Sequence, residues 1–171
     1  MIVPALLSGW ACARLWAVSI LIRLAEAGDV DTVARFNAAM AWETEHLKLD
    51  AARLRAGVDG LLADPSRGFY LLAMVDGKVA GQLMITFEWS DWRSGVFWWI
   101  QSVYVDPAQR QRGIFKKLYQ EVEQLAAERG EVCGIRLYVE KDNSQAQGVY
   151  ERLGMKKTSY EVFELDYVIK R

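Results

Sequence analysis

The stretch from Ser102 to Leu118 constrains the fold of this chain more than any other. A run rich in β-branched residues ends at Asp106-Pro107, and an amphipathic segment begins at Gly113 and ends at Gly130. Apolar residues recur within that segment at helical spacing, namely Ile114, Phe115, Leu118, Val122 and Leu125. The sequence therefore predicts a strand that leads through a tight loop into a helix.

The loop and the first turn of this helix carry four cations, Arg110, Arg112, Lys116 and Lys117. The helix macrodipole favours acidic groups at this end, so the cations cost stability unless an anion lies among them. Free N–H groups at a helix start bind anions, and phosphate is the usual ligand. A bound phosphate group is one interpretation, and a solvated basic loop that keeps the surface soluble is the other.

A second strand and helix follow. Val132 to Glu140 reads as a strand, and a capping box comes next, with Asp142 as the N-cap and Gln145 at the third helical position. The pattern buries one stripe of the helix and ends it at a glycine, through Ala146, Val149, Tyr150, Leu153 and Gly154. Asn143 and Tyr150 are two turns apart, so we expect them to share one helical face.

These two regions resemble the two signatures of the GNAT superfamily, the acetyl-CoA-dependent N-acetyltransferases. Arg110-Gln111-Arg112-Gly113-Ile114-Phe115 is similar to the arginine-x-x-glycine-x-glycine/alanine signature. Asn143, Ala146, Tyr150 and Gly154 match the asparagine, alanine, tyrosine and glycine of the second signature. The resemblance covers roughly Ser19 to the C-terminus.

The resemblance implies a mixed α/β fold, with a largely antiparallel mixed sheet of about six or seven strands flanked by helices. The sheet would splay apart between the strand before the phosphate loop and the strand at 132–140, and acetyl-CoA, the cosubstrate, would lie in that notch. Two positions depart from the family. Phe115 replaces a small residue and must point away from the pyrophosphate, and Gln101 stands where many members carry a glutamate base.

The resemblance also implies roles for individual residues. The loop from Arg110 to Phe115 would hold the pyrophosphate, and a backbone N–H among Val103, Tyr104 and Val105 would polarise the thioester carbonyl. Asn143 would contribute to the cofactor site. Tyr150 matches the general acid that protonates the thiolate, because a phenol with a reference pKa near 10 suits a thiol. The alternative for Tyr150 is a tyrosine that only packs in the core.

The candidates for the catalytic base and for the acceptor pocket come mainly from residues around a tryptophan-rich hairpin. Glu88 is the first candidate base, directly or through a water, and the alternative is an exposed carboxylate at a strand end. Glu43 and Glu45 are second candidates, and bulk water is a third. A cationic amine, polyamine-like or amino-sugar-like, would suit a pocket of carboxylates and indoles built from Glu43, Glu45, Glu88, Asp91, Trp92 and Trp99. A protein N-terminus or lysine is a further alternative.

The remaining pattern predicts other elements of the same domain. Asp76-Gly77 is a strong hairpin signal between strands at 69–75 and 78–88, and a loop from Ser90 to Gly95 leads into a strand ending at Val105. The other expected elements are a strand at 19–24, helices at 29–40 and 47–61, and final strands at 155–158 and 160–168. Trp98 and Trp99 should point to opposite faces of their strand.

Composition excludes several classes of function. The chain of 171 residues has a formal net charge of −1, with no basic footprint for nucleic acid. One histidine and two cysteines provide no disulfide framework and no metal site, which favours a reducing, cytoplasmic setting. Residues 1–17 read as an apolar extension too short for a membrane span, ahead of a single domain at 18–171.

Two alternatives remain beside an N-acetyltransferase that acts on a small amine through a ternary complex, and the sequence argues against a third. A non-catalytic acyl-CoA-binding regulatory module is compatible with Gln101 and Phe115, and a protein or peptide N-acetyltransferase is compatible with the same signatures. A nucleotide-phosphate binder would need a glycine-rich loop with a Lys-Ser/Thr pair, which this loop lacks. The exposed aromatic residues make a homodimer plausible.

Overall fold

The computed structural model of the protein describes residues 19–169, so the apolar extension at 1–17 lies outside the described residues. The elements are β1 (Ile20–Leu24), α1 (Val30–Glu45), α2 (Ala51–Leu62), β2 (Gly68–Val75), β3 (Lys78–Ser90), β4 (Gly95–Val105), α3 (Ile114–Glu128), β5 (Val132–Leu137) and α4 (Ser144–Arg152). The chain forms two compact units, one that ends at Leu137 and one that begins at Tyr138.

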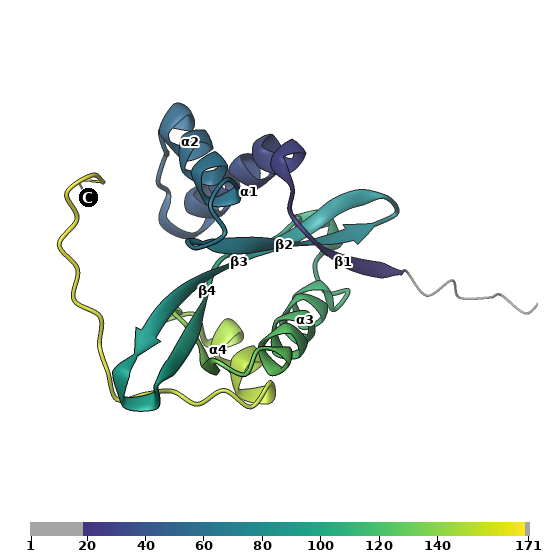
Figure 1. The fold of residues 1–171 in the computed structure, drawn as a ribbon. Coiled ribbons are helices and arrows are strands. Elements are labelled where there is room, and N and C mark those ends of the chain that lie inside the picture. The colour runs from purple at the N-terminus through teal and green to yellow at the C-terminus, as the bar shows by residue number, and fades with distance from the viewer. Residues whose placement is uncertain (1–18, 170–171) are drawn as a thin grey trace, which may run out of the picture. The chain divides into compact units, whose positions relative to one another are not determined.

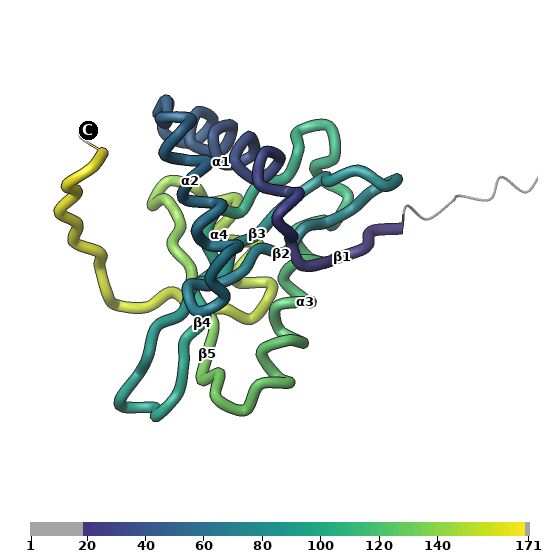
Figure 2. The backbone as a smooth tube through the Cα atoms, turned by 45° about the horizontal axis from the view of Figure 1, so that its top comes forward, coloured from purple at the N-terminus to yellow at the C-terminus, as the bar shows by residue number. Residues whose placement is uncertain are grey.

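The first unit is a five-stranded sheet with the strand order β1-β2-β3-β4-β5. The first four strands run antiparallel, and β5 is parallel to β4 because the α3 crossover connects them. Helices α1 and α2 lie on one face of the sheet and α3 lies on the other (Figures 1 and 2). This architecture confirms the mixed α/β prediction, with five strands in place of six or seven.

The hairpin between β2 and β3 turns at Asp76-Gly77, as the sequence predicts. Both turn residues have positive φ, 50° at Asp76 and 74° at Gly77. This is the pairing that a two-residue primed turn requires, because its twist matches that of the flanking strands.

Each face of the sheet buries its own group of apolar side chains. Helices α1 and α2 pack a cluster of Val30, Val33, Val58 and Leu61 against Tyr70 and Leu72 of β2. On the opposite side, α3 buries Ile114, Leu118, Tyr119 and Val122, which confirms the predicted helical stripe apart from Phe115 and Leu125. Burial of these two surfaces fixes the orientation of β3 and β4 between the helices.

The sheet splays apart where the resemblance to the GNAT superfamily implies it. Pairing between β4 and β5 stops at Ile100 and Leu137, while β4 continues to Val105. Within the part of the chain that the structure describes, no strand pairs with that edge of β4 beyond Ile100. The backbone of residues 101–105 is therefore open on one side.

A β-bulge interrupts β4 at the same place. Gln82 pairs with Tyr104 and Met84 pairs with Gln101, so Ser102 and Val103 together face Leu83 alone. Ser102 has φ 48°, a left-handed conformation in the middle of a strand. A bulge of this kind bends the strand and re-aims the backbone groups that follow it.

Several predicted boundaries differ in the second unit. The segments 155–158 and 160–168 are not strands, because an extended apolar pattern becomes a strand only when another strand pairs with it. The strand at 132–140 ends at Leu137. Helix α4 is capped by Asn143, whose Oδ1 accepts from the Ala146 N–H at 3.0 Å, so Asp142 and Gln145 do not form the predicted capping box.

Candidate active site

The loop between β4 and α3 presents an open helix N-terminus. Asp106 fixes the start of the loop, since its Oδ1 accepts from the Ala108 N–H at 2.9 Å. Gly113 is the N-cap of α3 with φ 77°, and no side chain caps the helix. No heavy atom lies within 4 Å of where a Cβ of Gly113 would be, and the first turn holds no acidic residue. The first N–H groups of α3 are therefore available to an anion.

The loop predicted to bind the pyrophosphate has an exposed part and a buried part. Gln111, Arg112 and Gly113 are exposed, and Arg112 donates to the Gln109 side-chain oxygen at 2.8 Å. Ile114 is buried in the core, so only its backbone can reach a ligand. Phe115 is half-buried with its ring 6.3 Å from that of Tyr119, so it packs along its own helix.

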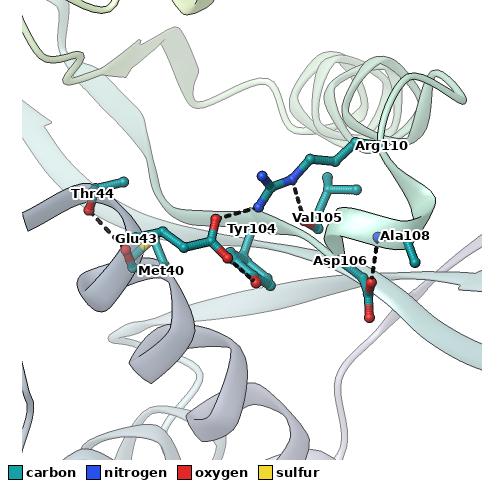
Figure 3. Close-up of polar contacts among 8 residues, drawn as sticks. All are labelled: Met40, Glu43, Thr44, Tyr104, Val105, Asp106, Ala108 and Arg110. Carbon is teal, nitrogen blue, oxygen red and sulfur yellow. Dashed lines mark hydrogen bonds and ion pairs between the residues drawn. The ribbon is translucent and has the colours of Figure 1, made fainter. Parts of the chain in front are cut away.

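Arg110 is held by a carboxylate of α1. Its guanidinium lies 2.5 Å from Glu43 Oε2 and donates to the Val105 carbonyl at 3.0 Å. The Tyr104 hydroxyl donates to Glu43 Oε1 at 2.7 Å (Figure 3). Arg110 also lies over the Tyr104 ring, 5.6 Å from its centroid. This triad joins the end of α1 to the phosphate loop.

The triad changes the acid–base character of its members. The Tyr104 hydroxyl and the Arg110 guanidinium hold the pKa of Glu43 below its usual value. Burial, together with the Glu43 carboxylate, raises the pKa of Tyr104 to about 12. Glu43 is thus a stable anion and a weak proton acceptor. Sequence reasoning placed Glu43 in the acceptor region, but its partner Arg110 is 67 residues away and no local pattern pairs them.

A second polar cluster lies on the α1 face of the sheet, further along β3 and β4. Glu88 accepts a hydrogen bond from the Trp99 indole N–H and lies 2.7 Å from the Arg136 guanidinium of β5. Arg136 in turn stacks on the Phe97 ring, 3.6 Å from its centroid. Both Glu88 oxygens are therefore occupied, and the carboxylate is fixed in orientation.

The other residues predicted to line the acceptor pocket do not come together in one place. Asp91 and Trp92 form the 3₁₀ turn η2 (Asp91–Arg93) at the tip of the β3–β4 hairpin, and Trp92 is 85% exposed. The nine steps along β4 from Gly95 to Tyr104 span about 30 Å at roughly 3.3 Å per residue, so this tip is far from Glu43. Glu45 is the exposed last residue of α1.

Strand β4 also carries Gln101 and the neighbouring indoles of Trp98 and Trp99. Gln101, where the family often has a glutamate, donates to the Thr86 hydroxyl at 2.6 Å. Trp98 is buried against Phe69 and Phe87 while Trp99 is half-buried, so the two indoles occupy opposite faces as predicted.

The second unit carries the remaining predicted residues. Tyr150 lies in α4 and is half-buried, and burial raises the pKa of its hydroxyl above 10.0. Asn143 is the N-cap of this helix, and its side-chain oxygen accepts from the Ala146 N–H at 3.0 Å. A raised pKa keeps the phenol protonated, which is the form that a general acid requires.

Residues 19–169 contain neither a cluster that could hold a metal ion nor a helix that could span a membrane. No group of three or more histidine, cysteine, aspartate or glutamate side chains among residues 19–169 is arranged to hold a metal ion. No helix within the same residues is long and apolar enough to cross a membrane.

The splayed mixed sheet and the uncapped basic loop beside it define a mixed α/β protein with an anion site at a helix N-terminus. The model of the Acetyltransferase (GNAT) family matches residues 30–155. The chain belongs to this family.

Individual relatives agree with this assignment. The crystal structure of a possible acetyltransferase from Clostridium difficile 630 is 44% identical, with a TM-score of 0.81 over 88% of this chain and 99% of that one. A predicted acetyltransferase from Clostridium acetobutylicum, solved with acetyl-CoA, shares the fold at 19% identity, with a TM-score of 0.70 over 86% of this chain and 96% of that one.

A curated relative gives a more specific name. The mycothiol acetyltransferase of Corynebacterium aurimucosum is 30% identical over 129 residues, which is 74% of this chain. The match spans only 42% of the length of that relative.

Proposed function

We propose that this protein transfers the acetyl group of acetyl-CoA to a primary amine, by direct attack within a ternary complex. The observation that carries the proposal is the open N-terminus of α3 beside the unpaired edge of β4. It provides an anion site and free backbone groups next to each other on consecutive elements.

The residues present fit the pyrophosphate of acetyl-CoA. The uncapped first turn of α3 offers backbone N–H donors, and Arg112, Lys116 and Lys117 are exposed around it. Arg110 differs, because Glu43 already neutralises its charge. We assign Arg110 to holding the loop in place, and the other three cations to the phosphates.

The acetyl group would meet β4 beyond the bulge. Formation of the N–C bond and loss of the C–S bond pass through a tetrahedral oxyanion, which a fixed backbone N–H among Val103, Tyr104 and Val105 would stabilise. The departing thiolate would take its proton from the Tyr150 hydroxyl. The amine would lose its proton to Glu88, directly or through a water, since Glu43 is too weak a base.

The nature of the acceptor is the least constrained part of the proposal. Arginines neutralise Glu43 and Glu88, and Asp91 lies at the distant tip of the β3–β4 hairpin, so these carboxylates do not single out a cationic amine. A small amine reaching the polar face of β3 and β4 near Trp99 fits best. A reducing, cytoplasmic location is part of the same proposal, because the chain has only two cysteines.

The test combines calorimetry of acetyl-CoA binding with thiol release across polyamines, amino sugars, aminoglycosides, amino acids and short peptides. We expect binding together with turnover on one class of amine. If acetyl-CoA does not bind, the assignment of the α3 loop is overturned. Binding without turnover on any amine would favour the regulatory module instead.

The Tyr150→Phe variant tests the chemistry. We expect kcat to fall roughly 10²- to 10⁴-fold while the acetyl-CoA Kd is unchanged, because only the proton donor is lost. In the native protein, activity should fall as the pH rises through the pKa of Tyr150, above its ordinary value of 10.0, because the protonated form is the acid. An unchanged kcat in the variant would assign Tyr150 to packing alone.

A further inference from the structure

A buried polar network lies under the β4 bulge and is not used by the chemistry proposed above. The Gln82 side chain on β3 is fully buried, and its Nε2 donates to Asn37 Oδ1 of α1 at 2.6 Å. The Asn37 amide in turn donates to the Tyr70 hydroxyl of β2 at 2.9 Å, and both of these residues are buried as well. Three elements thus meet in one chain of hydrogen bonds.

The network ends on Ser102. Gln82 Nε2 donates to the Ser102 carbonyl at 3.4 Å. Ser102 is the bulge residue with φ 48°. A residue other than glycine keeps such a conformation only when its surroundings impose it, and backbone strain of this kind concentrates at functional sites.

The network also keeps a feature that costs stability. Gln82 Oε1 is buried and has no hydrogen-bond partner. The amide cannot reverse to relieve this, because Nε2 faces two acceptors, the Asn37 side-chain oxygen and the Ser102 carbonyl. An apolar residue at this position would remove the buried unpaired oxygen. A requirement for the Nε2 donor explains why an amide is present instead.

We propose that Gln82, Asn37 and Tyr70 are positioning residues for acetyl transfer, which hold Ser102 in its strained conformation and so aim the backbone N–H groups of residues 103–105. The inference rests on the proposed function, in which one of those N–H groups stabilises the tetrahedral oxyanion. The network acts on the acetyl end of the cosubstrate and leaves the phosphate loop untouched. Its loss should therefore lower kcat and spare acetyl-CoA affinity.

The experiment compares Gln82→Met and Tyr70→Phe with the native protein. Gln82→Met keeps the length of the side chain and removes both donors, and Tyr70→Phe removes one hydroxyl. We expect kcat to fall about 10- to 100-fold in each, as small misplacements of a reacting group do, while the acetyl-CoA Kd stays within about twofold. Amide hydrogen exchange at residues 102–105 should accelerate in both variants without acetyl-CoA or any amine.

Two further variants separate positioning from general loss of stability. Val122→Ala empties part of the core under α3, on the face of the sheet opposite the network, and should lower Tm without changing kcat at a temperature where it stays folded. Ser102→Gly in the Gln82→Met background should restore part of kcat, because glycine adopts positive φ without support.

The outcomes distinguish the two proposals. A native protein without turnover would overturn the proposed function, and exchange at residues 102–105 would still test whether the network holds the bulge. An active native protein with unchanged kcat and unchanged exchange in both variants would overturn the positioning role. A fall in kcat for Val122→Ala equal to that for Gln82→Met would overturn it as well.

Discussion

At the scale of single residues, arginines orient both of the carboxylates near β4. Arg110 occupies Glu43 and Arg136 occupies Glu88, and each pair joins segments far apart in the chain. Both pairs are partly exposed, so solvent screens them and their contribution to stability is small. Their main effect is to fix where the two arginines and the two carboxylates point.

The pH dependence of stability should reveal the Glu43 triad. The pKa of Glu43 is lower in the folded protein than its ordinary value of 4.5, so the folded state binds its proton less well than the unfolded state does. The triad therefore stabilises the fold above about pH 4.5, and this contribution is lost as the pH falls through the lower, folded pKa. Glu43→Gln should destabilise the protein at pH 7 by up to about 1 kcal/mol and by less in acid.

Urea denaturation of both proteins at pH 7 and pH 3 measures this difference. Asp59→Asn is the matched control, since it removes an exposed carboxylate from α2 without touching the triad. A difference between native and Glu43→Gln that is equal at both pH values would contradict the pairing.

Residue-level prediction from the sequence succeeded where the signal is local and failed where it depends on distant partners. The cations of the α3 loop and the glycine at its N-cap are visible in the sequence. The attachment of Arg110 to Glu43, the occupied state of Glu88 and the strained φ of Ser102 are not, because each follows from the register of β3 and β4 or from the packing of α1.

At the scale of elements, the junction of β4 and β5 depends on one glycine. A Cβ at Gly134 would lie 2.5 Å from an edge carbon of the Phe97 ring. That ring carries the Arg136 guanidinium, which holds Glu88. The absent side chain therefore lets Phe97 lie flat against β5 and places the second polar cluster.

Gly134→Ala should displace Phe97 and with it Arg136 and Glu88. We expect a loss of about 1–3 kcal/mol in the free energy of unfolding, as overpacking usually costs, together with lower turnover. Gly130→Ala is the matched control, because nothing lies within 4 Å of its Cβ position. Urea denaturation and thiol release on both variants check this, and equal stability of the two would show that Phe97 does not constrain this position.

Elements with a strong local sequence signal were predicted better than elements that depend on a distant partner. The Asp76-Gly77 hairpin, the amphipathic stripe of α3 and the break between β4 and β5 agree with the sequence. The segments 155–158 and 160–168 do not, because alternation of apolar residues shows what a strand would bury but not whether a partner strand is present. The α4 cap moved by one residue, since Asp142 and Asn143 are both good caps.

At the scale of the whole molecule, the second unit ends in a segment rich in exposed apolar side chains. These are Tyr160, Val162, Phe163, Leu165 and Tyr167, with Phe163 at 92%. Alternation places Phe163 and Leu165 on one side of the extended chain, before the bend at 167–168. Many exposed apolar side chains close together mark an interaction site, and unpaired extended segments readily add to the edge of a sheet.

We propose that a homodimer covers this segment, with residues 160–168 of each copy seated on the other. Sedimentation should show a dimer at micromolar concentrations, and Phe163→Ser with Leu165→Ser should convert it to a monomer that still binds acetyl-CoA, because the α3 loop is in the first unit. Lys156→Ser with Lys157→Ser, in the same segment but without apolar loss, should leave the dimer intact. A native monomer, or a dimer unaffected by the apolar substitutions, would show that something other than a second copy covers these residues.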